Sequence, residues 1–306
     1  MNSREQTSQE LADDMLVRFF YMDTPTEDVL GRLDSLTLKP CDKQDDVPFN
    51  AQVKGYSGAI DSDGDLWILK PSPTAKETLY NRVCALAYLL DHWMGTLSAP
   101  TTVFTIDGKK YRASKVIRNS IQISSYNYME SPFIGWLRTD IINRWLYFDE
   151  DRNPNNYLVI RNSKDHPFVV AIDFDKADFD STEMKIEGMQ DHFGWIRSEK
   201  TRFLTLLRPD NFMGVAIEAF EPKLETMMAI PSEALRRLAF RLVDGYCDAP
   251  KEMAEQLASN IERRRSYIDT YFRKMFKPES ATISVSHSDD YSMFGPSFLS
   301  AYDKKH

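Results

Sequence analysis

Two polar segments near the middle of the chain place acids and amides beside apolar runs. DRNPNN begins at Asp151, ends at Asn156 and is followed at once by the apolar run YLVI. AIDFD places Asp173 directly after the apolar run FVVAI. A tight Asn-Pro turn can fold Asp151 and Asn156 toward one point, where a carboxylate can orient a hydroxyl proton and an amide oxygen can bind Mg²⁺. The alternative for DRNPNN is a solvated turn, and the alternative for AIDFD is a strand end with its acids in solvent.

A glycine turn and a lysine precede these two segments. The turn GYSG, made of Gly55, Tyr56, Ser57 and Gly58, lies between strand-like runs and would let backbone N–H groups approach phosphate oxygens closely. Lys70 follows the run LWIL, so the core would hold its stem and its ammonium could act as a fixed charge for phosphate. A plain hairpin and a lysine that reaches water are the alternatives. In this order, the four features form the set that two-metal phosphoryl transfer requires, in which the protein positions a nucleotide and neutralises its charge.

The hydrophobic patterns predict the elements that would position these groups. Two short helices are expected at the N-terminus, before strand-like runs over 51–71 that flank the turn DSDGD. A helix is expected from Ser72 or Thr74 to Gly95, and the hairpin 101–117 has DG at its turn. A helix over 133–147, a short strand pair and further helices follow. The pattern therefore predicts an α+β fold with two unequal lobes.

The chain is divided accordingly into four parts. They are an N-terminal helical extension (1–47), a small β-rich lobe (48–118), a larger helical lobe (119–278) and a Ser/Asp-rich tail (279–306). In the helical lobe, Arg263, Arg264 and Arg265 are interpreted as the solvated face of a C-terminal helix.

The motif pair DRNPNN and AIDFD resembles the catalytic and metal-binding loops of phosphatidylinositol 3/4-kinases and of HipA-like kinases, two branches of the wider protein-kinase-like fold. The stretch GYSGAIDSDGDLWILKP, with the later LSAPTTV and FTIDGKKY, looks more like the HipA-like branch. The resemblance covers roughly residues 50–180. It implies ATP and Mg²⁺ as cofactors and gives each residue a role. Asp151 would be the catalytic base, Asn156 and Asp173 would hold Mg²⁺, Lys70 would contact phosphates, and Gly55 to Gly58 would cover the nucleotide.

The chain departs from that family pattern at three positions. Asn153 stands where a histidine is common, and Asp175 stands where the metal motif usually has glycine. Arg82 stands where related kinases often have the glutamate that pairs with the strand lysine. Glu77 could substitute, but its spacing from Thr74 favours a capping box. The partner of Lys70 therefore stays open at this point.

Composition limits the other classes of function. The 306 residues carry a net charge of −8, which disfavours nucleic acid as a general partner. Three scattered cysteines and no apolar run of about 20 residues predict a reduced, cytoplasmic chain without a transmembrane segment. The favoured acceptor is a Ser or Thr hydroxyl on a protein substrate. A small molecule or inositol-lipid acceptor, nucleotidyl transfer on the same fold, and a pseudokinase that only binds partners remain alternatives.

Overall fold

The computed structural model describes residues 3–41, 47–149, 154–180, 214–276 and 278, which form two β-sheets and a set of helices. The larger sheet has five strands in the order β1-β2-β3-β5-β4, and the smaller has three in the order β6-β7-β8. The first sheet comprises β1 (Lys39–Pro40), β2 (Ser57–Ile60), β3 (Leu66–Pro71), β4 (Thr101–Ile106) and β5 (Lys109–Lys115). The second comprises β6 (Ile121–Gln122), β7 (Tyr157–Arg161) and β8 (Pro167–Ala171).

The turn between β2 and β3, which the sequence DSDGD predicts, is built by one aspartate. Asp61 Oδ1 accepts the backbone N–H groups of Asp63 and Asp65, each at 2.9 Å. Its Oδ2 accepts the indole N–H of Trp67 at 2.8 Å. Gly64 has a φ of +83°, a conformation that glycine adopts without steric cost. The side chain of Asp61 therefore fixes both the turn and the first residues of β3.

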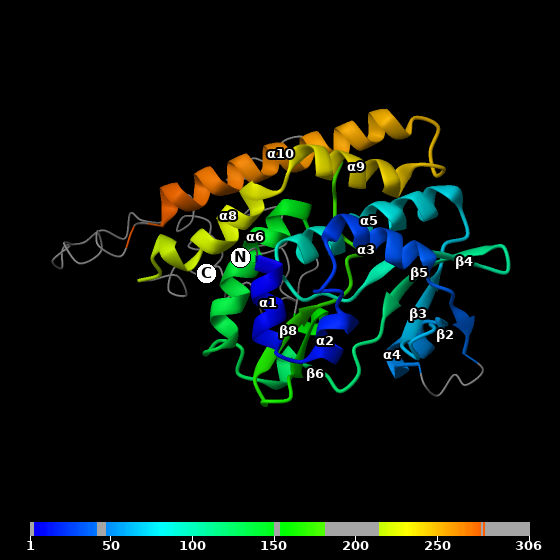
Figure 1. Cartoon of the computed structure of the whole chain (residues 1–306), viewed down its shortest axis with the longest axis horizontal. Helices are drawn as coiled ribbons and strands as arrows, with labels where there is room; N and C mark the ends of the chain where they lie inside the picture. Colours follow the sequence, from blue (N-terminus) through cyan, green and yellow to red (C-terminus); the bar gives the residue numbers. More distant parts are fainter. Residues whose placement is uncertain (1–2, 42–46, 150–153, 181–213, 277, 279–306) are drawn as a thin grey trace, which may run out of the picture.

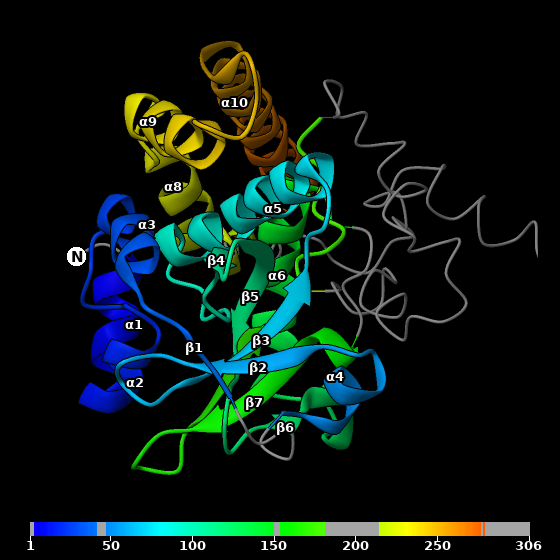
Figure 2. The same ribbon diagram turned by 90° about the vertical axis from the view of Figure 1, so that its right-hand side faces the viewer.

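Helix α5 (Ala75–Trp93) covers one face of the larger sheet and packs on β4 and β5 (Figure 2). It begins with the predicted capping box, in which Thr74 Oγ1 accepts the N–H of Glu77 and Glu77 accepts the N–H of Thr74. Alternation along β3 sends Trp67 and Leu69, both buried, toward this helix. Ile68 and Lys70 therefore point to the opposite face of the sheet.

The remaining helices form the larger, helical part of the molecule. Helix α10 (Pro250–Met275) packs along α9 (Ser232–Val243) and also contacts α8 (Glu221–Ala229) and α6 (Phe133–Tyr147) (Figure 1). Short 3₁₀ helices lie at η2 (Ile123–Ser125), η3 (Pro154–Asn156) and η6 (Ile217–Ala219). The predicted α+β arrangement of a β-rich part and a larger helical part is confirmed.

Two local expectations are wrong. The N-terminal region contains three helices rather than two, α1 (Ser3–Leu11), α2 (Asp14–Phe19) and α3 (Thr26–Ser35). Ala12 ends α1 with a φ of +48°, and Asp13 caps α2. The first strand-like run is partly helical, because α4 (Phe49–Val53) precedes β2. The division of the chain at 47, 118 and 278 stays a prediction, and the tail 279–306 lies outside the described residues.

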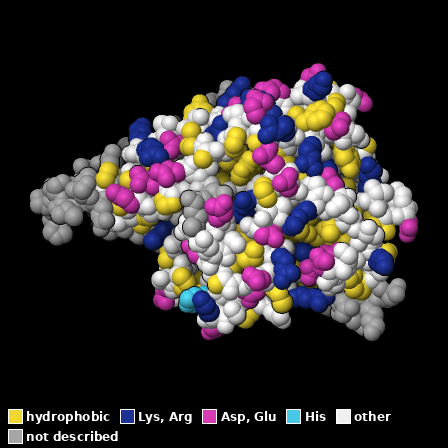
Figure 3. Space-filling model, in the orientation of Figure 1, with side chains coloured by type: hydrophobic (Ala, Val, Ile, Leu, Met, Phe, Trp, Pro, Cys, Tyr) yellow, Lys and Arg dark blue, Asp and Glu magenta, His cyan; other side chains and the backbone are white. Residues whose placement is uncertain are grey.

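Charged side chains of both signs are interspersed over the face shown in Figure 3. Within the described part of the chain, no helix has both the length and the apolar character that a membrane crossing requires.

The N-terminal helices are attached to α5 through a buried histidine. The carbonyl oxygen of Tyr21 can only accept, so the Nε2–H of His92 donates to it at 2.9 Å. In the neutral imidazole, Nδ1 then accepts the hydroxyl of Thr26 at 2.8 Å. Burial is the main cause that lowers the pKa of His92 from 6.5 to about 4.

We expect the free energy of unfolding to fall as the pH falls from about 6.5 to about 4, because the unfolded chain protonates His92 in this window and the folded chain does not. The contribution of His92 amounts to about 3 kcal/mol across the window. Denaturant unfolding at several pH values would measure it. In His92→Gln, which cannot titrate, the pH dependence should be weaker by that amount. An identical pH dependence in both proteins would contradict the assignment.

Candidate active site

A cleft of about 450 Å³ lies between the two sheets and is lined by both apolar and charged side chains. The apolar residues lie on β3 and β7, in the chain that joins β5 to β6, just before β4 and just after β8: Ile68, Ala99, Val116, Ile117, Leu158 and Ile172. The charged and amide residues include Lys70, Arg112, Asn155, Asn156, Asp173 and Asp175, and also Lys54, Lys115 and Gln122. Four residues that the sequence singled out thus line one cleft: Tyr56, Lys70, Asn156 and Asp173.

The register of β3 against β5 places Lys70 and Arg112 beside each other in the cleft. Lys70 pairs with Arg112 and Ile68 pairs with Ser114, so these four side chains share the cleft face of the sheet. Arg112 is almost completely buried, with a side-chain exposure of 4%, whereas that of Lys70 is 36%. Arg112 is a cleft residue that is not predicted from the sequence. Its signal is the polar and apolar alternation of KKYRASK, which identifies a cleft residue only once the pairing of this hairpin with β3 is known.

The pairing of β7 with β8 brings together the two predicted metal ligands. Tyr157 pairs with Ala171, and the next pair outward is joined by a hydrogen bond from the N–H of Ile172 to the carbonyl oxygen of Asn156 at 2.9 Å. Asn156 and Asp173 therefore leave the same end of this strand pair. An amide oxygen and a carboxylate at one point are suitable ligands for Mg²⁺, which prefers oxygen.

Asp173 has a backbone conformation that side chains seldom adopt. Its φ is +59°, in the left-handed region where Asp and Asn are tolerated better than other residues. The following Phe174 is fully buried and packs edge-on against Tyr147, with ring centroids 5.9 Å apart. Because the apolar side chain is fixed in the core, Asp173 and Asp175 on either side of it are directed toward the cleft. Strained residues of this kind cluster at functional sites.

Asp175 forms ion pairs with both Lys70 and Arg112, and Asp173 forms one with Arg112. Lys70 Nζ lies 2.5 Å from Asp175 Oδ2, and Arg112 Nη2 lies 3.3 Å from Asp173 Oδ1. Arg112 Nη1 also contacts Asp175 Oδ1. The hydroxyl of Tyr80, on α5, donates to the backbone carbonyl oxygen of Asp175 at 2.6 Å. Asp175 is therefore the partner of Lys70 that the sequence left open.

The two helix residues considered for that role are engaged elsewhere. Glu77 remains in the capping box with Thr74. Arg82 is buried and donates to Asp34 at 2.9 Å, to Thr102 at 2.8 Å and to the carbonyl oxygen of Leu242 at 3.1 Å. It thereby joins α5 to α3, β4 and α9.

The glycine segment enters the site through one residue. Tyr56 lines the cleft, whereas Gly55 ends the turn after α4 with a φ of +72° and Ser57 is exposed at the start of β2. Gly58 is required by packing, because a Cβ there would lie 2.7 Å from Val47 Cγ2. A role of the whole segment in covering a nucleotide stays a prediction. Asp151 and Asn153 lie outside the described residues.

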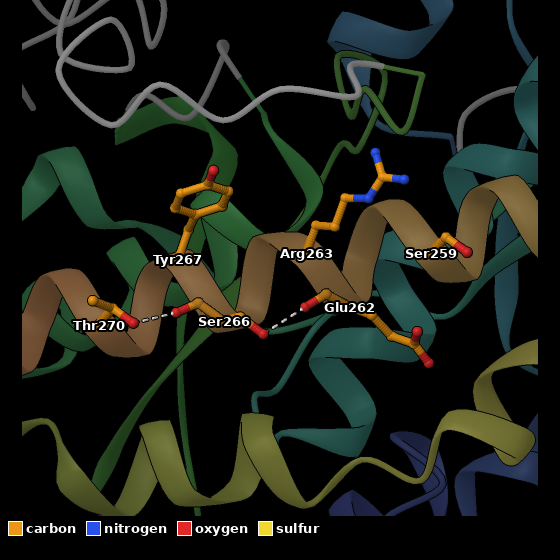
Figure 4. A pocket seen from close by; sticks show the side chains of 6 residues that line it. All are labelled: Ser259, Glu262, Arg263, Ser266, Tyr267 and Thr270. Atoms are coloured by element: carbon orange, nitrogen blue, oxygen red, sulfur yellow. Dashed lines mark hydrogen bonds between the residues drawn. The ribbon is translucent and has the colours of Figure 1, made fainter.

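A second hollow lies along the outer face of α10 (Figure 4) and is lined by Ser259, Glu262, Arg263, Ser266, Tyr267 and Thr270. The hydroxyl of Ser266 donates to the carbonyl oxygen of Glu262 at 3.0 Å, and that of Thr270 to the carbonyl oxygen of Ser266 at 2.8 Å. Both hydroxyl groups therefore form hydrogen bonds within α10 itself. The cleft between the sheets is the better candidate for an active site, because charged groups from separate elements converge there.

Arg264 differs from the arginine before it. Arg263 is exposed, whereas Arg264 is buried and its Nη1 donates to the carbonyl oxygens of Leu146 at 3.2 Å and Asp178 at 2.6 Å. Burial is the main cause that lowers the pKa of Arg264 from 12.5 to about 10. The interpretation of Arg264 as part of a solvated face is therefore wrong. Its guanidinium ties the end of α6, just before the segment of Asp151, to the chain that follows Asp175.

Comparisons with known proteins add little to this geometry. No family model matches the chain, and no curated protein does. Among solved structures, the crystal structure of a Helicobacter pylori proinflammatory kinase, CtkA, aligns with a TM-score of 0.44 and 13% sequence identity. The alignment covers 76% of this chain and 96% of that chain. A similarity of this size is distant, so the functional argument depends on the residues of the cleft.

We expect Arg264→Met to destabilise the protein by about 2–4 kcal/mol, because two buried carbonyl oxygens lose their donor. Arg263→Met, at the neighbouring exposed position, should change the free energy of unfolding by less than about 0.5 kcal/mol. Denaturant unfolding of both variants would measure the difference. Equal stability of the two variants would show that the guanidinium of Arg264 holds nothing in place.

Proposed function

We propose that this chain is a phosphotransferase that uses ATP and Mg²⁺, and that it acts as a serine/threonine protein kinase of the HipA-like type. The observation that carries the proposal is one cleft, lined by both apolar and charged side chains, to which Lys70, Asn156 and Asp173 all contribute. A nucleotide requires both kinds of group, because its base has apolar faces and its phosphates are anionic.

The residues of the cleft fit such a ligand in size and in chemistry. A volume of about 450 Å³ lies within the range of about 300–1,000 Å³ that is usual for small-molecule sites. Arg112 Nε is buried and has no hydrogen-bond partner among the described residues, so the guanidinium retains an unused donor. Asn156 and Asp173 provide the oxygen ligands that Mg²⁺ prefers.

Each residue then has a specific task. Ile68, Ile117 and Leu158 would pack on the base, and Lys70 would bind phosphate oxygens through its ammonium. Asn156 and Asp173 would hold the metal ion. Asp151, five residues before Asn156, would orient the acceptor hydroxyl and accept its proton. Bound ATP and Mg²⁺ would supply the transferable phosphoryl group and the cation that neutralises its charge.

Incubation of the purified protein with ATP labelled on either the α- or the γ-phosphate, followed by intact-mass measurement, tests the reaction. Addition of a phosphate with the γ-label alone supports a kinase. Addition of a nucleotide with the α-label would replace kinase chemistry by nucleotidyl transfer. Binding of ATP without any transfer, to the protein itself or to added protein and small-molecule acceptors, would support the pseudokinase alternative.

We expect Mg²⁺ with ATP to raise the melting temperature of the wild type more than ATP alone does, because ligands that bind the folded state stabilise it. Asp173→Asn should remove most of the added shift and abolish transfer. Without ligand its stability should change by no more than about 1 kcal/mol, because the ion pair that it loses with Arg112 is partly exposed on the aspartate side.

Asp151→Asn is the matched variant, since its proposed role is toward the acceptor. It should lose transfer and keep most of the Mg²⁺-dependent shift in thermal denaturation. If both variants transfer phosphate at the wild-type rate, DRNPNN is a surface turn and the proposed function is wrong.

A further inference from the structure

The strand register places Lys70 and Arg112 directly opposite each other, with both side chains on the cleft face. Like charges at such cross-strand positions destabilise a sheet unless anions accompany them. Asp175 supplies the anion, because one carboxylate oxygen contacts Lys70 and the other contacts Arg112. The carboxylate therefore fixes the separation of the two cations.

Asp175 is itself held from a third element. Its backbone carbonyl oxygen accepts the hydroxyl of Tyr80 from α5, and Phe174 beside it is fixed in the core. Its side chain therefore reaches β3 and β5 from a supported position. A carboxylate so placed sets where the two cations lie before any ligand enters, which is the requirement for a preorganised anion site.

The balance of formal charge favours a ligand with several phosphates. Lys70 and Arg112 contribute two positive charges, and Asp173 and Asp175 contribute two negative charges. A divalent cation at Asp173 and Asn156 would turn this neutral cluster positive and would compete with Arg112 for the carboxylate of Asp173. The guanidinium of Arg112 would then be available to bind phosphate oxygens through its planar fork.

From this geometry we propose that Arg112 is a second phosphate-binding residue of the cleft, and that Asp175 is a positioning residue that holds Arg112 and Lys70 as a pair. This inference rests on the proposed function and adds to it a specificity for the number of phosphates on the ligand. Affinity in the presence of Mg²⁺ should rise with the number of phosphates, in the order adenosine, AMP, ADP and ATP.

Lys109 offers a control on the same strand. It is an exposed cation at the start of β5 and does not line the cleft. Its loss should therefore leave phosphate recognition unchanged.

Calorimetric titration with adenosine, AMP, ADP and ATP in the presence of Mg²⁺ tests Arg112. In Arg112→Gln the affinity for ATP should fall at least about tenfold while the affinity for adenosine is unchanged. Arg112→Lys should recover part of the loss, and it serves as the test variant if Arg112→Gln does not fold. Lys109→Met should keep the dependence on phosphate number. Unchanged ATP affinity in both Arg112 variants, or an equal loss for adenosine and ATP, would overturn the assignment.

The steady-state rate of ATP turnover, to water or to the protein itself, tests Asp175. In Asp175→Asn we expect kcat to fall about tenfold or more, because the cations lose their fixed spacing. KM for ATP should not rise, because the variant removes a negative charge from the phosphate site. A rise in both KM and the Mg²⁺ concentration for half-maximal rate would identify Asp175 as a metal ligand and overturn its positioning role.

Inorganic tripolyphosphate separates a failure of this inference from a failure of the proposed function. If the wild type binds tripolyphosphate through Arg112 but does not bind ATP, the cation pair stands and the nucleotide-dependent function fails. If the wild type binds ATP and transfers its phosphate, and the Arg112 variants bind both tripolyphosphate and ATP as tightly as the wild type, the proposed function stands and the second cation is rejected.

Discussion

One carboxylate between two cations connects the parts of the site that come from distant segments of the chain. Lys70 and Arg112 are neighbours only because β3 pairs with β5, and Asp175 reaches them only because Phe174 is anchored in the core. The hydroxyl of Tyr80 adds α5 to the same point. A shift of any of these elements would separate charges whose close approach depends on all of them.

The smaller sheet contributes the other half of the site by simple pairing. Since β7 and β8 are antiparallel and end together, Asn156 lies opposite Ile172, and Asp173 follows Ile172 at the same end of the strand pair. Arg264 then supports the chain on both sides of this pair through the carbonyl oxygens of Leu146 and Asp178. The proposed metal ligands thus lie on a local hairpin, and the proposed phosphate-binding cations lie on strands that are distant in the sequence.

The difference between local and non-local order explains what could be predicted from the sequence. Asp61 and the pair of Thr74 with Glu77 carry their signals within a few residues, and the structure has the expected turn and helix start there. Asn156 and Asp173 likewise lie beside the ends of β7 and β8, and their role in metal binding stays a prediction. Arg112 is a site residue because of a pairing between strands about 40 residues apart, which periodicity does not encode. Arg264 was misjudged, and Asp175 was not recognised as the partner of Lys70, for a related reason. Acids and arginines are ordinarily solvated, and only tertiary contacts reveal a buried partner. The helix at Phe49–Val53 was missed because five residues are too few for a helical period to be recognised.

Arg82 has a consequence for how the site can change. Its guanidinium lies in the interior and bonds at once to α3, β4 and the end of α9, so α5 is fastened to the helical part as well as to the sheet. Rotating α5 about its axis would break several buried hydrogen bonds together, at a cost of several kcal/mol. We therefore expect α5 to keep its position when the cleft changes shape. Adjustment of the cleft is therefore expected in the short segment from Asp173 to Asp175, where one left-handed residue already stores backbone strain.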